Sequence, residues 1–222
     1  MKPMPAQTEE ARAAGPTLNS LAGVALEPNQ EAFLDLARAT SGGPAVWRER
    51  KLAEARELFA LGGFSRRITV LGLDLLEDFR AMLVMRVPVP FRRPGAETPT
   101  FAAEVLIGLS YRPDNLRLPS PGYVFVQILS PLHVWHAQVA ALPAGIQSLC
   151  LGPRLPAGIR VRELLLMTYG ALSMQSVQLD VADAAGVMNP EAARWWLQPA
   201  NRQRIPLSRE PFVAPLNPEG KP

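Results

Sequence analysis

Residues able to act as nucleophiles or metal ligands are scarce in this chain. It has one cysteine, Cys150, and two histidines, His133 and His136, among 222 residues. A single cysteine excludes an internal disulfide and a cysteine-based zinc site. Signatures of phosphate-binding glycine loops, zinc proteases and serine-hydrolase elbows are absent from the sequence. Any cysteine or histidine chemistry therefore lies within residues 129–153, which contain all three side chains.

Long apolar runs are also missing. No stretch approaches the ~20 apolar residues that cross a bilayer, and residues 1–19 lack the hydrophobic segment of a secretory signal. The net charge is only +3, and the basic residues are scattered rather than interleaved with aromatics. Neither a membrane nor a nucleic acid is therefore expected as a partner. Because 48% of the residues are hydrophobic, a core can form, and these features favour a soluble cytoplasmic protein.

Lysine is rare while arginine is common. The chain has 23 basic residues, of which only Lys2, Lys51 and Lys221 are lysines. GC-rich codon usage, which also favours Ala, Pro, Gly and Leu, is the simplest explanation. A functional explanation is considered below.

The first half of the chain predicts two helices after a tail. Residues 1–26 lack a sustained period and are expected to be a disordered or extended tail. A helical extension is predicted over residues 27–44, with Pro28 at its first position and acidic residues in its first turn. A second helix is predicted from residue 45 to residue 61, ended by Gly62 and Gly63. Its predicted apolar stripe is Trp47, Leu52, Ala55, Leu58 and Phe59, and its predicted solvent face is Arg48, Glu49, Arg50, Glu54 and Glu57.

The second half predicts a sheet and further helices. β-like segments cover residues 65–71, 80–89, 101–111 and 123–129. A turn-rich link occupies residues 92–99, and prolines mark an irregular connection over residues 111–123. Short links between successive strands favour an antiparallel meander. Helices are predicted over residues 160–174, from the apolar spacing, and from Asn189-Pro190 onward, a cap followed by proline. The expected class is α+β, with a four-stranded antiparallel meander flanked by helices and a C-terminal tail at residues 213–222.

This order of segments and several short motifs resemble the ubiquitin-conjugating enzyme (UBC) family. The resemblance covers roughly residues 47–212 and implies a UBC-like conjugating domain over residues 45–212. It is nearest to bacterial members encoded with ubiquitin-like proteins, activating enzymes and JAB-type isopeptidases. The matching segments are the tyrosine- and proline-rich stretch 111–126, the Leu-Cys-Leu segment at 148–152, the helix at 161–172 and the Asn-x-x-Ala-Ala element within 188–196.

The resemblance implies thioester chemistry on Cys150. This residue would accept the C-terminus of a ubiquitin-like protein from a ThiF-like activating enzyme and pass it to an acceptor amine. The His-Pro-Asn tripeptide of eukaryotic members is absent, and His133 and His136 stand near its place. Either histidine could accept a proton or assist electrostatically, and the sequence does not decide between them. No metal or organic cofactor is implied, since ATP is used by the activating enzyme.

The proteins that are encoded with bacterial members of the family suggest a role in antiviral defence. In this setting, the scarcity of lysine would limit self-modification.

Other interpretations remain open at this stage. Cys150 lies between two leucines and could be an inert buried residue. The chain could then be a catalytically inactive UBC-like binding or scaffold module. A Cys–His hydrolase is the weakest alternative, because residues 129–153 contain no Asp or Asn to orient a histidine.

Overall fold

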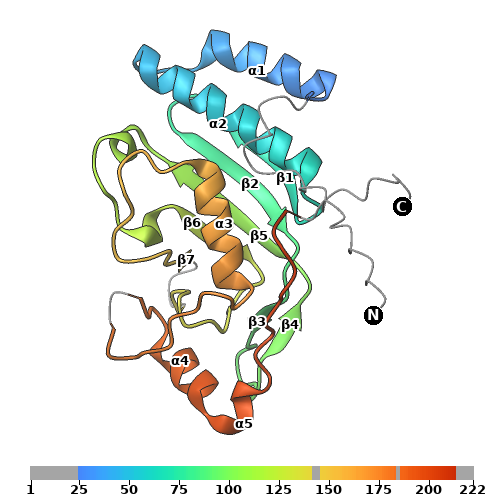
Figure 1. The fold of residues 1–222 in the computed structure, drawn as a ribbon, viewed down its shortest axis with the longest axis vertical. Coiled ribbons are helices and arrows are strands. Elements are labelled where there is room, and N and C mark those ends of the chain that lie inside the picture. Colours follow the sequence, from blue (N-terminus) through green and yellow to red (C-terminus); the bar gives the residue numbers. More distant parts are fainter. Residues whose placement is uncertain (1–24, 142–145, 184–185, 214–222) are drawn as a thin grey trace, which may run out of the picture.

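The structure, a computed structural model, describes residues 25–141, 146–183 and 186–213 (Figure 1). The predicted tails at 1–26 and 213–222 lie almost entirely outside these residues. The described chain is α+β, with two sheets and several helices. The helices are α1 (Pro28–Thr40), α2 (Ala45–Phe64), α3 (Val161–Leu172), α4 (Pro190–Leu197) and α5 (Pro199–Arg202), with short 3-10 turns η2 (Pro113–Leu116) and η3 (Gly122–Val124).

The main sheet is an antiparallel meander in which strands adjacent in the sheet follow one another along the chain. Its order is β1 (Ile68–Asp74), β2 (Phe79–Met85), β5 (Val105–Tyr111), β6 (Val126–Ser130) and β7 (Gln147–Leu149). The expected four-stranded meander corresponds to the first four of these strands. The fifth, β7, pairs with β6 at the sheet edge and ends immediately before Cys150.

A separate hairpin interrupts the meander between β2 and β5. It consists of β3 (Val89–Phe91) and β4 (Thr100–Ala102), and the link predicted over residues 92–99 is its loop. The hairpin also reaches the histidine-bearing loop, since the Arg92 amide donates to the His133 carbonyl and the Trp135 amide donates to the Pro90 carbonyl. This pairing places the hairpin loop next to residues 133–135.

The core lies between one face of the sheet and helices α2 and α3. Strands β2 and β5 bury alternate residues, as period-two patterns require. Their register pairs Leu83 with Ile107 and Ala81 with Leu109, so the buried sets share one face. Helix α3 contributes Leu164, Leu165, Thr168 and Leu172 to the buried layer in front of the sheet (Figure 1).

Helix α2 differs from its prediction in two respects. It continues through Gly62 and Gly63 to Phe64, where the Ser65 amide still donates to the Leu61 carbonyl. Its polar face is also not fully solvated, because Glu54 and Lys51 are buried. The predicted stripe is confirmed for Trp47, Leu52, Ala55 and Leu58, which belong to the core.

Glu54 is buried together with ionic partners from α2 itself and from the N-cap of α3. Its carboxylate lies 2.7 Å from the Nε atoms of both Arg50 and Arg160 and accepts the Val161 amide at the start of α3. Burial raises the pKa of Glu54 despite these opposing charges. Glu57 joins the cluster through Arg160 and Arg162. The network fixes α2 against the first turn of α3.

Candidate functional site

Cys150 occupies a closed position just after β7. Its amide donates to the Gln138 carbonyl at 2.8 Å, and the Gln138 side-chain amide donates to the Cys150 carbonyl at 3.2 Å. The Cys150 thiol faces the Gly152 carbonyl, with 3.5 Å between sulfur and oxygen. The residue is only 2% exposed. The thioester chemistry implied by the resemblance needs a sulfur that an acyl donor can reach, and the structure instead shows a buried one.

The segment after Cys150 is covered by the proline-rich connection that precedes β6. Ser120 and Leu155 exchange two backbone hydrogen bonds, of 3.1 and 2.8 Å, and the Gly122 amide donates to the Gly152 carbonyl at 3.0 Å. Gly122 lies so close that an added Cβ atom would be 2.5 Å from the Gly152 oxygen. The irregular connection predicted over residues 111–123 is therefore confirmed, and it holds the residues that follow the cysteine.

His136 lies in the same buried layer as Cys150 and is linked to it through Gln138. It is 0% exposed, and its Nδ1 accepts the Gln138 amide at 3.1 Å. Nδ1 is therefore unprotonated, and Nε2 carries the proton that it donates to the Ala171 carbonyl at 3.0 Å. Burial lowers the pKa of His136 to about 4, against the smaller opposing effect of the Ala171 bond. The ring is thus a neutral bridge between the loop and α3, with both nitrogens occupied.

His133 is placed differently from His136. It is exposed, with a backbone φ of 59°, and it lines a pocket of about 490 Å³ whose walls include neither Cys150 nor His136. The structure therefore brings two of the three predicted site residues together through Gln138, and it places the third on another surface. The catalytic roles of all three residues stay predictions.

Gln138 is the residue that sequence reasoning missed. It is buried, and its hydrogen bonds connect His136 to Cys150. Its side-chain Oε1 is buried without a hydrogen-bond donor among the described residues. The sequence feature that could have identified it is an amide side chain two positions after His136. Glutamine, like Asn or Asp, can hydrogen-bond near a histidine.

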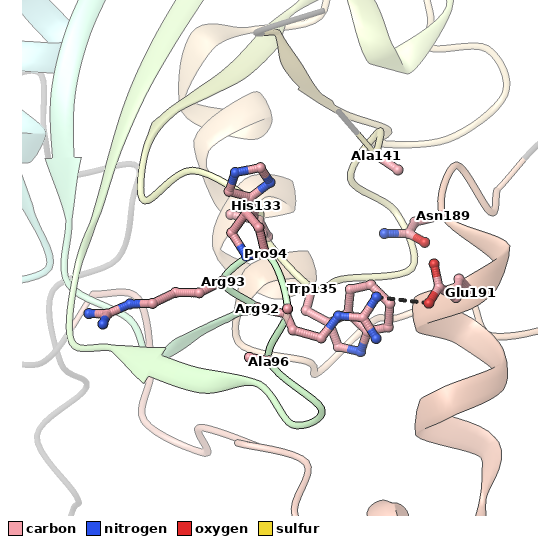
Figure 2. A pocket seen from close by; sticks show the side chains of 11 residues that line it. Arg92, Arg93, Pro94, Ala96, His133, Trp135, Ala141, Asn189 and Glu191 are labelled. Atoms are coloured by element: carbon pink, nitrogen blue, oxygen red, sulfur yellow. Dashed lines mark hydrogen bonds and ion pairs between the residues drawn. The ribbon is translucent and has the colours of Figure 1, made fainter. Parts of the chain in front are cut away.

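The pocket beside His133 lies between the β3–β4 loop and the start of α4 (Figure 2). The Arg92 guanidinium stacks on the Trp135 ring, 3.4 Å from its centroid, and its Nη2 lies 2.8 Å from Glu191. Asn189 caps α4 by accepting the Ala192 amide at 3.0 Å. The predicted cap at Asn189, with proline at the first helical position, is confirmed.

Two possible features are not found in the part of the chain that the structure describes. None of the described residues forms a group of three or more His, Cys, Asp or Glu side chains that could hold a metal ion. Nor does any helix in the described ranges have the length and apolar character needed to cross a membrane.

The fold and site therefore define an α+β protein with a mostly antiparallel sheet and a buried cysteine after its edge strand. Comparison with known protein families, with curated proteins and with solved structures found no match to this chain.

Proposed function

We propose that the chain is a UBC-like conjugating enzyme that carries a ubiquitin-like protein as a thioester on Cys150. The observation that carries the proposal is the position of Cys150 in the order of elements. Helix α2 precedes the meander, β7 leads directly into Cys150, and α3 follows and packs on the sheet. Apart from β7, which was not predicted, this is the order of segments on which the resemblance rests.

The chemistry would proceed in two acyl transfers. The Cys150 thiolate attacks the thioester carbonyl of the loaded activating enzyme, a new C–S bond forms, and the cysteine thiolate of that enzyme leaves. An acceptor amine then attacks the Cys150 thioester, the C–N bond forms, the amine loses a proton, and the Cys150 thiolate leaves. Hydrogen-bond donors must stabilise the oxyanion in each step. Gln138 offers a side-chain amide close to Cys150, since it already donates to the Cys150 carbonyl.

The buried sulfur is the main argument against this function. At 2% exposure Cys150 cannot receive a bulky acyl donor in the conformation observed. We expect loading to need the connection around Gly122 to separate from Gly152, because the Cys150 sulfur faces the Gly152 carbonyl and the two glycines are hydrogen-bonded and in close contact. The proposed enzyme is therefore closed at rest and opens when the activating enzyme docks.

A second candidate function is favoured by the same burial. Cys150 and His136 are packed and hydrogen-bonded as structural residues would be. In this case the chain is a UBC-like module that binds a ubiquitin-like protein or an activating enzyme without forming a thioester. The missing Asn of the His-Pro-Asn tripeptide agrees with this alternative.

One experiment separates the two functions. The chain is mixed with ATP and with a bacterial ubiquitin-like protein and its activating enzyme, and the products are run on non-reducing and reducing gels. An adduct that thiols remove and that Cys150→Ala abolishes supports the enzyme. Gln127→Ala, at an exposed position of β6, serves as the control and should still load. A stable complex without an adduct selects the binding module. If neither an adduct nor a complex forms, both proposed functions are contradicted.

A further inference from the structure

The pocket next to His133 contains hydrogen-bond donors that the described residues leave unused. Asn189 is only 3% exposed, and its side-chain oxygen is fixed by the Ala192 amide. The side-chain nitrogen must therefore face the other way, and it points toward the pocket (Figure 2). No described residue accepts from this nitrogen, whose two N–H groups are free to bind an acceptor.

A second unused donor belongs to a residue of the pocket wall. Trp135 is 6% exposed, and its Nε1–H is buried without an acceptor among the described residues. Buried polar groups are normally hydrogen-bonded, so this indole N–H lacks an acceptor, although the atom itself is closed off from the pocket in this structure. Two unused donors favour a ligand with oxygen lone pairs.

A cation stands beside these donors. The Arg92 guanidinium is held by the Trp135 ring on one side and by Glu191 on the other, so its orientation is fixed before any ligand binds. Because Glu191 is mostly exposed, solvent weakens its ion pair with Arg92, and it only partly neutralises the Arg92 charge. Arg93 also lines the pocket, although its guanidinium extends away from Arg92 (Figure 2).

From these donors and this cation we infer that the pocket binds the oxyanion of a small molecule, a carboxylate or a phosphate. The volume of about 490 Å³ is in the range of small-molecule sites. A planar carboxylate matches the arginine fork, whereas a phosphate offers more acceptors to Asn189 and Trp135. Neither Cys150 nor His136 lines this site, and His133 is the one predicted catalytic residue on its wall.

The test is an NMR titration of the ¹⁵N-labelled full chain with citrate and, separately, with inorganic phosphate. Saturable shifts of the Trp135 indole N–H and the Asn189 side-chain amide are expected, and the tighter probe identifies the oxyanion. Shifts that never saturate, or shifts at neither group with either probe, overturn the inference.

Two isosteric variants then test the recognition itself. Asn189→Asp keeps the oxygen that caps α4 but replaces the donor by a carboxylate, so affinity should fall about tenfold or more. Glu191→Gln removes the anion that competes for Arg92, so affinity should rise about two- to fivefold.

Matched controls with the same charge changes are available elsewhere. Asn29→Asp and Glu49→Gln lie at exposed positions on α1 and α2. Equal effects of the pocket variants and the controls would show a general charge effect and overturn the site. An unchanged affinity in Asn189→Asp would do the same, provided that its NMR spectrum shows a folded chain.

Discussion

Gln138 and Cys150 hold each other through reciprocal hydrogen bonds, one from the Cys150 amide to the Gln138 carbonyl and one from the Gln138 side chain to the Cys150 carbonyl. The pair joins the histidine-bearing loop to the residue that follows β7. We therefore expect motions that expose the Cys150 sulfur to strain contacts made by this pair or by the connection around Gly122, which holds Gly152 next to the sulfur.

Removing the Gln138 side chain tests the first of these restraints. Gln138→Ala should lower the free energy of unfolding by about 1 kcal/mol, because the Cys150 carbonyl loses its side-chain donor. The loss is limited because Gln138 Oε1 accepts no hydrogen bond from the described residues, so the substitution breaks none at this atom. Alkylation of Cys150 in the folded chain should become faster, and since the chain has one cysteine, mass spectrometry reads this directly. Gln127→Ala, at an exposed position of β6, should change neither quantity.

The contact between Gly122 and Gly152 provides the second test. Gly122→Ala places a Cβ atom 2.5 Å from the Gly152 oxygen and 2.7 Å from its nitrogen, so the two segments must separate. We expect a loss of about 1–3 kcal/mol in unfolding free energy and faster alkylation of Cys150. Gly63→Ala is the matched control, because nothing lies within 4 Å of its added Cβ. It should stabilise α2 by about 0.4–1 kcal/mol and leave the thiol unreactive. Faster alkylation in both variants would contradict the idea that the connection around Gly122 restricts access to Cys150.

His136 predicts a specific dependence of stability on pH. Burial lowers its pKa from 6.5 to about 4 in the folded chain, whereas the unfolded chain binds a proton at the ordinary value. The unfolded state therefore holds more protons between these two values, and the free energy of unfolding should fall as the pH is lowered through this window. The total loss is roughly 3 kcal/mol.

Urea unfolding measured across this pH window checks the prediction. His136→Gln should abolish the part of the slope that His136 causes, although the variant will be less stable at neutral pH. Gln127→Ala, which replaces an exposed side chain that does not titrate, should keep the wild-type slope. If wild type and His136→Gln lose stability in parallel, the depressed pKa of His136 is wrong.

The sequence predicted those parts of the fold that depend on local periodicity. Alternation in Phe79–Met85 and Val105–Tyr111 identified two central strands, and the helical spacing of Leu164, Leu165 and Leu172 identified α3. The cap at Asn189 was readable because Asn followed by Pro is a local signal.

Features that depend on distant partners were not predictable in this way. Strand β7 has three residues, too few for a period, and it exists because it pairs with β6. Glu54 was assigned to the solvent face of α2, but it is buried by Arg160 and Val161, more than 100 residues further along the chain. The burial of Cys150 was one of two open interpretations: its neighbours Leu149 and Leu151 favoured it, whereas the resemblance implied a sulfur that an acyl donor can reach.

Lys51 offers the last test, which bears on the scarcity of lysine. It is 0% exposed, and its ammonium donates to the carbonyls of Gly42, Leu75, Leu76 and Glu77 at 2.5–3.2 Å. Burial lowers the pKa of Lys51, and the nearby carboxylates of Asp78 and Asp74 oppose this effect. Lys51 is the only lysine in the described ranges, so this part of the chain presents no accessible lysine amine.

We therefore expect Lys51 to resist reductive methylation in the folded chain and to react only after unfolding, as peptide mass spectrometry would show. Lys51→Met should lower the unfolding free energy by about 1–3 kcal/mol. The loss is bounded because Ser41, Gly42 and Trp47 also donate to the carbonyls of residues 75–77. Glu49→Met, on the exposed side of the same helix, is the control and should be nearly neutral. Extensive self-conjugation at Lys51 in the reconstituted reaction would contradict both its burial and the idea that scarce lysine protects a conjugating enzyme.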